Sequence, residues 1–411
     1  MIDRRAVVTG IGGALASGVA GLTPRTTLSQ ERPPLVPGLP QGVYDTAILD
    51  TLPGKKPLIK LTYRPPNYET PVTYFATAIT PNDAFFVRYH LADIPEKIDR
   101  TSWRVQVGGE AAANPFQLSL DELQTGFEQV EITAVCQCAG NRRGLSHPHV
   151  PGIEWGLGAM GNAVWRGVRL KDLLAKAGLR KETVEIVVNG ADGPVTDKTP
   201  DFVKSIPLWK ALDENTIVAH QMNGQPLPHF NGFPARLIVP GWTATYWMKH
   251  LVTIEAAAKT FDGFWMKAAY RIPTGKFPIA QHFLSQMTAA NEPITEIVVN
   301  SVIAFPADNQ QLRVGQPLKL GGVAWDGGYG IRQVEISTDN GITWRAADLG
   351  QDLGRFAFRT WSYNFTPQTS GKHTITVRAS NAIGQTQTES LIFNPAGYHN
   401  NVVRSLTITA V

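Results

Sequence analysis

The sequence predicts an α+β protein in which a mixed domain precedes an immunoglobulin-like β-sandwich. Three observations support this fold class. The chain has 411 residues, which is too long for one ordinary hydrophobic core. Its 38 glycines and 29 prolines indicate many strands and turns with modest helix. The residue pattern changes near Asn291, from strands mixed with helices to strands alone.

The N-terminal segment has the pattern of an export signal. Arg4 and Arg5 precede a Gly- and Ala-rich apolar stretch at 6–22, and a polar segment with prolines follows. This pattern resembles a twin-arginine signal, whose apolar part is less hydrophobic than that of an ordinary secretory signal. We expect removal of residues 1–30 and a periplasmic protein. No stable membrane span is expected, because the apolar stretch is short and contains five glycines.

The first domain is expected at 31–295. Its Pro-rich start, through Pro66, is typical of extended chain. Apolar residues at helical spacing predict a helix over 164–179 that ends at Gly178. Residues 236–241 are typical of a buried strand closed by a Pro-Gly turn.

The second domain is expected at 296–411. Apolar and polar residues alternate with period two in 298–302, 334–337, 374–377 and 406–409. Asp339-Asn340-Gly341 indicates a hairpin between two strands. About 110 residues of such strands predict an immunoglobulin-like sandwich.

The charge balance argues against one class of partner. The net charge is +4, and no run of basic residues is interleaved with aromatic ones. A nucleic-acid interface needs such a basic stripe, so no nucleic-acid role is expected. A mild positive charge is suited to attracting anionic substrates or an acidic partner.

Cys138 opens a short turn, Cys138-Ala139-Gly140-Asn141-Arg142-Arg143. Thiolate binds soft and borderline metals, and paired guanidinium groups bind oxyanions. Taken alone, the segment is better explained as an ordinary buried cysteine before a polar turn. Cys136 is too close for an unstrained disulfide, so we expect free thiols or one metal ligand. A zinc site of Cys136, Cys138, His147 and His149 is a rival, although adjacent cations are unusual in such sites.

Other candidate residues carry weak signals individually. In the predicted strand 85–90, Arg88 and His90 point to the same face, which by itself is typical of a solvated edge. Asp192 lies in an ordinary turn sequence, and Lys249 and Tyr270 look like partly buried residues.

Together, six segments resemble the sulfite oxidase family of molybdenum enzymes. They are FFVRYH (85–90), CAGNRRG (138–144), EWGLGAMGNAVWRGVRL (154–170), HFNGFPARLIVPG (229–241), FDGFWMKAAYRIP (261–273) and FNPAGYHNNVV (393–403). The resemblance covers 55–411 and is strongest to bacterial periplasmic sulfite dehydrogenases without a fused haem domain. It implies a sulfite-oxidase-type mixed α/β molybdopterin domain followed by a dimerisation sandwich.

The resemblance also implies a molybdenum-molybdopterin cofactor and roles for single residues. Cys138 would be the metal ligand and Cys136 a core thiol, while Arg88, Arg143 and Tyr270 would act in catalysis. Residues matching positions that hold the pterin or its phosphate are Phe86, Arg88, Tyr89, His90, Asp192, Asn231, Arg236 and Lys249. Asn231 replaces a His of the animal members. A further substrate-pocket arginine is expected near the C-terminus, and Arg404 is the candidate.

The implied reaction is molybdenum-dependent oxidation of sulfite to sulfate. Electrons must leave singly, and the chain has no Cys-x-x-Cys-His haem motif. A periplasmic c-type cytochrome is therefore the expected acceptor, with a homodimer or a complex with a cytochrome subunit as the assembly. The alternatives are a sulfane dehydrogenase subunit of a thiosulfate-oxidising system, a periplasmic sulfoxide reductase and a non-catalytic binding module.

Overall fold

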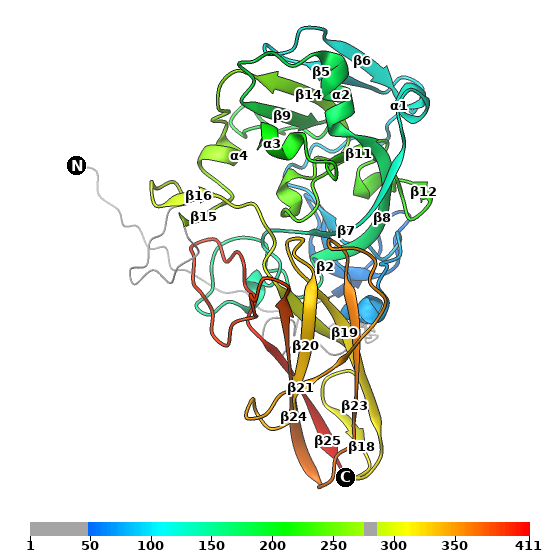
Figure 1. Cartoon of the computed structure of the whole chain (residues 1–411), viewed down its shortest axis with the longest axis vertical. Coiled ribbons are helices and arrows are strands. Elements are labelled where there is room, and N and C mark those ends of the chain that lie inside the picture. The colour runs from blue at the N-terminus through cyan, green and yellow to red at the C-terminus, as the bar shows by residue number, and fades with distance from the viewer. Residues whose placement is uncertain (1–47, 275–285) are drawn as a thin grey trace, which may run out of the picture. The chain divides into compact units, whose positions relative to one another are not determined.

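A computed structural model describes residues 48–274 and 286–411 (Figure 1). The predicted signal at 1–30 and the beginning of the Pro-rich approach lie outside the described residues. Within them, the α-helices are α1 (Leu120–Thr125), α2 (Leu170–Ala177), α3 (Leu208–Ala211) and α4 (Phe264–Lys267). Short 3₁₀ turns occupy Val72–Ala76, Arg143–Leu145, His229–Asn231 and Ala244–Tyr246. No helix of this part is long and apolar enough to cross a membrane.

The mixed first domain contains three sheets in its described part. The first has the order β1 (Ile48–Asp50), β2 (Leu58–Thr62), β3 (Asn67–Glu69) and β4 (Val87–Arg88). The second has the order β10 (Lys204–Pro207), β9 (Glu185–Gly190), β14 (Leu251–Ala257), β5 (Arg104–Gly108) and β6 (Phe116–Ser119). The third has the order β12 (Gln225–Pro226), β11 (Ile217–Met222), β8 (Met160–Arg169) and β7 (Val130–Gln137), with β13 (Arg236–Ile238) also paired to β11.

The second domain is a two-layered sandwich. One sheet has the order β17 (Asn300–Phe305), β19 (Leu318–Trp325), β23 (Arg359–Phe365) and β22 (Asp348–Leu349). The other has the order β18 (Gln310–Leu312), β25 (Arg404–Ala410), β24 (Gly371–Asn381), β20 (Ile331–Ser337) and β21 (Arg345–Ala346). Leu320, Val334 and Ile375 are buried between the sheets. A ribbon of β15 (Arg271–Pro273) and β16 (Asn291–Pro293) precedes this domain. The predicted α+β class with a sandwich is confirmed.

The helix predicted over 164–179 is correct only from residue 170 onwards. Residues 160–169 form β8, which pairs with β7 on one side and β11 on the other. Because β8 is buried on both faces along much of its length, its apolar residues do not alternate strictly. A continuously apolar strand cannot be distinguished from a helix by spacing alone. The end was predicted correctly, since Gly178 adopts a left-handed φ of 68° after α2.

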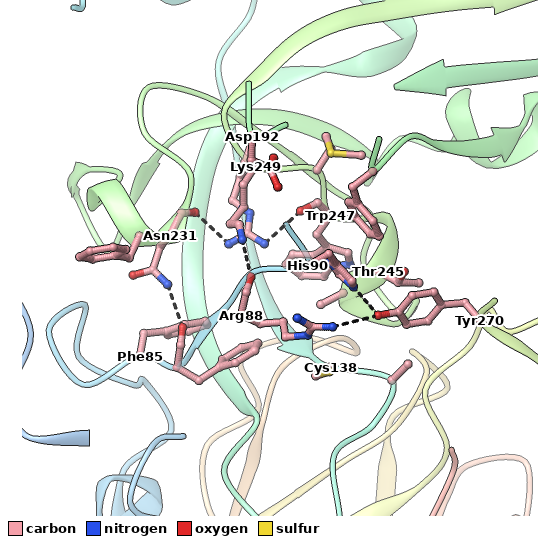
Figure 2. Close-up of a pocket in the computed structure, with 17 residues that line it drawn as sticks. Phe85, Arg88, His90, Cys138, Asp192, Asn231, Thr245, Trp247, Lys249 and Tyr270 are labelled. Carbon is pink, nitrogen blue, oxygen red and sulfur yellow. Dashed lines mark hydrogen bonds between the residues drawn. The ribbon is translucent and has the colours of Figure 1, made fainter. Parts of the chain in front are cut away.

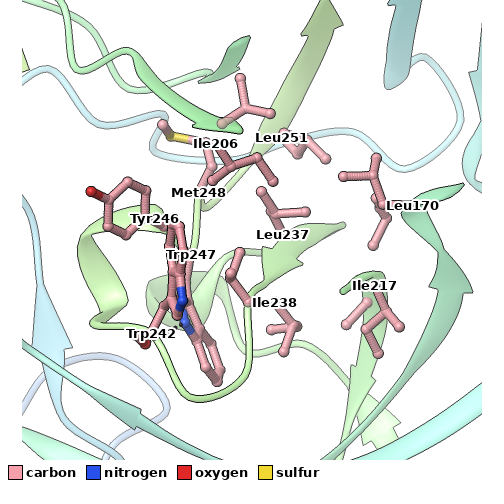
Figure 3. Close-up of a cluster of buried hydrophobic side chains, with 14 of the residues drawn as sticks. Leu170, Ile206, Ile217, Leu237, Ile238, Trp242, Tyr246, Trp247, Met248 and Leu251 are labelled. Carbon is pink, nitrogen blue, oxygen red and sulfur yellow. Dashed lines mark hydrogen bonds between the residues drawn. The ribbon is translucent and has the colours of Figure 1, made fainter. Parts of the chain in front are cut away.

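One large apolar cluster supports the loops that lead to the predicted site (Figure 3). Leu237 and Ile238 of β13 pack in it together with Leu170 of α2 and Ile217 of β11. Trp247 and Met248 belong to the same cluster and also reach the cavity described below. The cluster therefore anchors the 236–249 segment on the cavity side of the domain.

Candidate active site

One cavity brings together nine of the predicted site residues (Figure 2). They are Phe86, Arg88, His90, Cys138, Asp192, Asn231, Arg236, Lys249 and Tyr270. These residues come from β4 and its flanks, the turn after β7, the loop after β9, the segment around β13 and the loop before β15. Folding alone makes them neighbours, because the chain separates Phe86 from Tyr270 by more than half of the first domain.

The two cysteines differ in what surrounds them. Cys138 follows the last residue of β7 and lines the cavity, and its N–H donates to the Ala159 carbonyl at 2.9 Å. Cys136 lies inside β7, where Arg236 Nη2 is 3.7 Å from its Sγ. Burial raises the pKa of Cys136 to about 11, so this thiol keeps its proton at neutral pH. Cys138 is therefore the cysteine that the fold presents for ligation.

The rival zinc site does not assemble. Between residues 48 and 274 and between 286 and 411, no three His, Cys, Asp or Glu side chains gather as a metal site. The His149 side chain is 68% exposed and faces Glu154, not the cysteines. A tetrahedral zinc site needs four such ligands on one centre.

Three cations line the cavity: Arg236, which is buried, and the partly buried Arg88 and Lys249. Arg236 donates from Nη1 to the Asn231 carbonyl at 2.9 Å and from Nη2 to the Trp247 carbonyl at 3.2 Å. Lys249 Nζ donates to the Arg88 carbonyl. Burial lowers the pKa of Lys249 to about 7 and raises that of Asp192, the carboxyl group in the cavity lining, while each charge favours the other. The lining thus has more cationic than anionic groups.

Arg88, His90 and Tyr270 form a hydrogen-bonded group. Arg88 Nη1 donates to Asn67 Oδ1 at 3.2 Å, and Nη2 lies 3.5 Å from the Tyr270 hydroxyl. That hydroxyl also shares a hydrogen bond with His90 Nε2. Burial, assisted by the Arg88 charge, lowers the pKa of His90 far below its usual value, so the imidazole is neutral. Burial raises the pKa of Tyr270, which keeps its phenol protonated.

The cavity fits an anionic cofactor held through a thiolate-bound metal. Arg88 Nε, Arg236 Nε and Thr245 Oγ1 are buried and have no hydrogen-bond partner in the part of the chain that the structure describes. Unpartnered buried donors are costly unless a ligand satisfies them. A phosphate or pterin acceptor would supply the missing partners, and the Cys138 thiol is the candidate for a soft metal ligand.

Two predicted residues and one further candidate do not line the cavity. Tyr89 lies behind it, where its hydroxyl donates to His250 Nε2 at 2.6 Å and its ring lies 3.2 Å from Lys249 Nζ. Arg143 donates from Nε to the Ala396 carbonyl at 2.7 Å and from Nη1 to the Ile153 carbonyl at 3.1 Å. Arg404 begins β25 in the sandwich. Their assigned roles stay predictions.

Several lining residues gave no recognisable signal in the sequence. These are Phe85, Ala139, Phe202, Phe230, Ala244, Thr245, Trp247 and Met248. Lys55 was also missed: it is buried, and its Nζ donates to Asn231 Oδ1 at 2.5 Å and to the Phe85 carbonyl at 3.0 Å. Burial lowers the pKa of Lys55 to about 7. Its position in a Gly-Lys-Lys segment looks like an exposed turn, so no local pattern identifies it.

Two segments of the chain match known domain families. Residues 90–265 match the oxidoreductase molybdopterin binding domain, and residues 291–410 match the Mo-co oxidoreductase dimerisation domain. Mitochondrial sulfite oxidase of Homo sapiens is 34% identical over 322 residues, which are 75% of this chain and 57% of that protein. Sulfite oxidase of Arabidopsis thaliana is 30% identical over 318 residues, 74% of this chain and 79% of that protein. The chain therefore spans little more than half the length of the human relative.

The fold also matches a solved structure. The crystal structure of the sulfane dehydrogenase SoxCD from Paracoccus pantotrophus superposes with a TM-score of 0.70 at 24% identity. The match covers 83% of this chain and 84% of that one. The chain therefore has a fold that is already known from a crystal structure.

Proposed function

The chain belongs to the sulfite oxidase family of molybdenum enzymes, with molybdenum-molybdopterin as its cofactor, and we propose that it oxidises sulfite to sulfate. One observation carries the proposal: the Cys138 thiol lines the same cavity as the Arg88 guanidinium and the Tyr270 hydroxyl. A metal ligand, a cation and a neutral hydrogen-bond donor are the groups that a redox reaction on a small oxyanion requires.

Different residues would bind the metal and the anionic end of the cofactor. Cys138 would hold the metal, and Thr245, Arg236 and Lys249 would hold the anionic end, because they offer a hydroxyl and two cations to one cavity. Lys55 would keep the Asn231 amide oriented, through the bond to its Oδ1. When bound, the cofactor accepts two electrons from sulfite and mediates the transfer of an oxygen atom from water to sulfur.

Substrate orientation would depend on Arg88 and Tyr270. A guanidinium about 4 Å from a sulfite oxygen contributes on the order of 4 kcal/mol at an effective dielectric of about 20, before desolvation. The Asn67 amide oxygen and the Tyr89 carbonyl hold the Arg88 guanidinium in place. Tyr270 would donate its proton in a hydrogen bond as charge moves between the anion and the cofactor. Sulfite and water yield sulfate, two protons and two electrons.

The electrons would leave one at a time to a c-type cytochrome in the periplasm. The export pattern around Arg4 and Arg5 supports this compartment, and the absence of a haem motif in the sequence supports a separate acceptor. The match to a dimerisation domain supports assembly through the sandwich, either as a homodimer or with a cytochrome subunit.

A second candidate function uses the same cavity. The fold shared with the sulfane dehydrogenase SoxCD supports a protein-bound sulfane as an alternative substrate. A steady-state assay of cytochrome c reduction, with the purified exported protein and either sulfite or a protein-bound sulfane, distinguishes them. Sulfite-dependent reduction is expected, and activity with the sulfane alone would replace the proposal.

Cofactor analysis of the same preparation tests the premise. Molybdenum near one atom per chain and pterin fluorescence after oxidative release are expected. Protein that lacks both after correct export would contradict an enzymatic role and favour a binding module.

A further inference from the structure

A second tyrosine, supplied by the sandwich domain, lies against Tyr270. Tyr398 belongs to the loop between β24 and β25, and only 4% of it is exposed. Its ring is stacked on that of Tyr270, with the ring centroids 5.7 Å apart and the planes at 11°. Arg143 Cζ lies 5.3 Å from the centroid of the Tyr398 ring. Tyr398 therefore contacts two residues that the sequence assigned to catalysis, Tyr270 and Arg143.

The Tyr398 hydroxyl has no hydrogen-bond partner among residues 48–274 and 286–411, although its ring is buried. Tyr398 is not itself a lining residue of the cavity, but it packs on Tyr270, which is, and it lies within electrostatic range of Arg143 and Arg88. Burial raises its pKa, which keeps the hydroxyl a donor at neutral pH. A tyrosine in the interior ordinarily finds an acceptor, whereas the described residues provide none here. The Tyr398 oxygen is also not one of the fully buried unpartnered atoms, so it stays accessible to a ligand.

The loop that carries Tyr398 is tightly held. Asn394 Nδ2 donates to the Tyr398 carbonyl at 2.7 Å, and the Tyr398 N–H donates to Asn394 Oδ1 at 2.9 Å. Gly397 has a φ of 61°, and a Cβ there would lie 2.5 Å from Val150 Cγ2 and 2.9 Å from Arg143 Cγ. The Ala396 carbonyl accepts from Arg143 Nε. The hydrogen bonds to Asn394 hold the Tyr398 backbone, and Tyr270 and Arg143 contact its ring. A residue that binds a ligand needs such a fixed orientation.

We propose that Tyr398 is a substrate-binding residue, whose hydroxyl donates a hydrogen bond to an oxygen of the sulfite anion beside Tyr270. The inference rests on the proposed function, because it names a further group of the same anion site. The sandwich domain would then contribute to binding the substrate. The sequence suggested Arg404 for this contribution, but Arg404 lies in β25, and Tyr398 is the residue that contacts Tyr270.

The test is Tyr398→Phe in the molybdenum-loaded enzyme, which removes one oxygen atom and keeps the ring. Loss of a hydrogen bond to an anion is expected to raise the sulfite KM about tenfold, with kcat within about twofold. Calorimetry should show the Kd of the product anion, sulfate, weakened by a similar factor. The melting temperature should not fall, because the hydroxyl bonds to no protein group. Tyr68→Phe is the control: Tyr68 is buried, and its hydroxyl bonds to Asp50 at 3.2 Å outside the cavity lining.

Each outcome decides the inference. Unchanged sulfite KM and sulfate Kd in Tyr398→Phe would overturn it. A lower kcat with both affinities unchanged would also overturn it, because Tyr398 would then act only by supporting the Tyr270 ring. If the wild-type protein is loaded but oxidises no sulfite, the proposed function fails, and calorimetry with sulfate still decides whether Tyr398 binds an oxyanion.

Discussion

The two domains differ in the polar side chains that they bury. Among the described residues, the first domain buries ten acidic, basic or histidine side chains: Lys55, Glu69, Arg142, Arg143, Asp192, Lys204, Lys210, His220, Arg236 and His250. In the described part of the sandwich, from Asn300 onwards, the one buried side chain of the acidic, basic or histidine type is Asp326, and the other buried polar ones are amides and hydroxyls. Burying a charge costs several kcal/mol even when it is paired. The cost is concentrated in the domain that holds the cavity, which indicates that those charges serve chemistry more than stability.

The contact between the domains also pairs charged groups of the first domain with neutral groups of the sandwich. Arg142, fully buried in the Cys138 turn, donates from Nη1 to the Val402 carbonyl at 2.9 Å and from Nη2 to the Ser301 carbonyl. Asn400 Nδ2 donates to the Arg142 carbonyl at 3.1 Å. The sandwich thus supplies neutral backbone acceptors to the cations of the Cys138 turn. Two residues of this one short turn have separate surroundings, with Cys138 at the cavity and Arg142 at the domain contact.

The largest effect is expected from Cys138→Ser, which removes the proposed metal ligand from the charged domain. Sulfite oxidation should fall by about 100-fold or more, since even residues behind a metal ligand affect activity by about 10–100-fold. Steady-state cytochrome c reduction and molybdenum content are the measurements. Cys136→Ser is the matched control and should keep most of the activity. The reverse pattern would assign ligation to Cys136.

A smaller loss is expected from Arg88→Gln, which removes one cation but keeps a polar side chain. The sulfite KM should rise about 10- to 100-fold, which corresponds to the loss of one charged hydrogen bond of about 1.5–3 kcal/mol. The control is Arg104→Gln, an exposed arginine of β5. Equal KM values for Arg88→Gln and the wild type would remove Arg88 from the substrate site.

Lys204→Met tests the cost of a buried charge in the first domain. Lys204 Nζ donates to the Trp265 carbonyl at 2.6 Å and lies 5.3 Å from the Tyr270 ring centroid. Burial lowers its pKa to about 7, whereas the unfolded chain has a value near 10.4. Between these values only the unfolded state holds the proton, so Lys204 makes the protein progressively more stable as pH rises from about 7 towards about 10.4, and its effect levels off below about 7.

Urea denaturation at pH 7 and pH 9 measures this effect. From pH 7 to pH 9, the free energy of unfolding should increase by about 2 kcal/mol less in Lys204→Met than in the wild type. Lys319→Met, an exposed lysine of β19 in the sandwich, should follow the wild type. If the free energy of unfolding had the same pH dependence in all three proteins, the charge of Lys204 would not destabilise the folded state.

The smallest effect is expected from Asp326→Asn, in the sandwich. Asp326 accepts from Asn381 Nδ2 and from the Gly328 N–H, each at 3.0 Å. Substitution should cost about 1 kcal/mol of unfolding free energy, typical of a neutral replacement in a hydrogen-bonded turn. The sulfite KM should not change. An altered KM would mean that this buried carboxyl also acts on the site, and the contrast between the domains would weaken.

Local patterns predicted the sandwich better than the first domain. Positive φ values of 58° at Asn340 and 85° at Gly341 confirm the predicted turn, which joins the paired strands β20 and β21. In the first domain, β8 was taken for helix because both of its faces are buried. The predicted strand at 85–90 is reduced to Val87–Arg88, yet Arg88 and His90 both line the cavity. Alternation predicts side-chain direction even where pairing is short.

The sequence by itself determined the order of the domains, the strand pattern of the sandwich, its turns and the types of residue in the candidate site. Period-two alternation and turn chemistry act over a few residues, so they can be read locally. Only the tertiary structure decided which of two nearby cysteines faces the cavity, that Arg143 bonds to Ala396, and that Tyr398 stacks on Tyr270. Burial and charge at a site are sums over neighbours brought from distant segments, so no local pattern contains them.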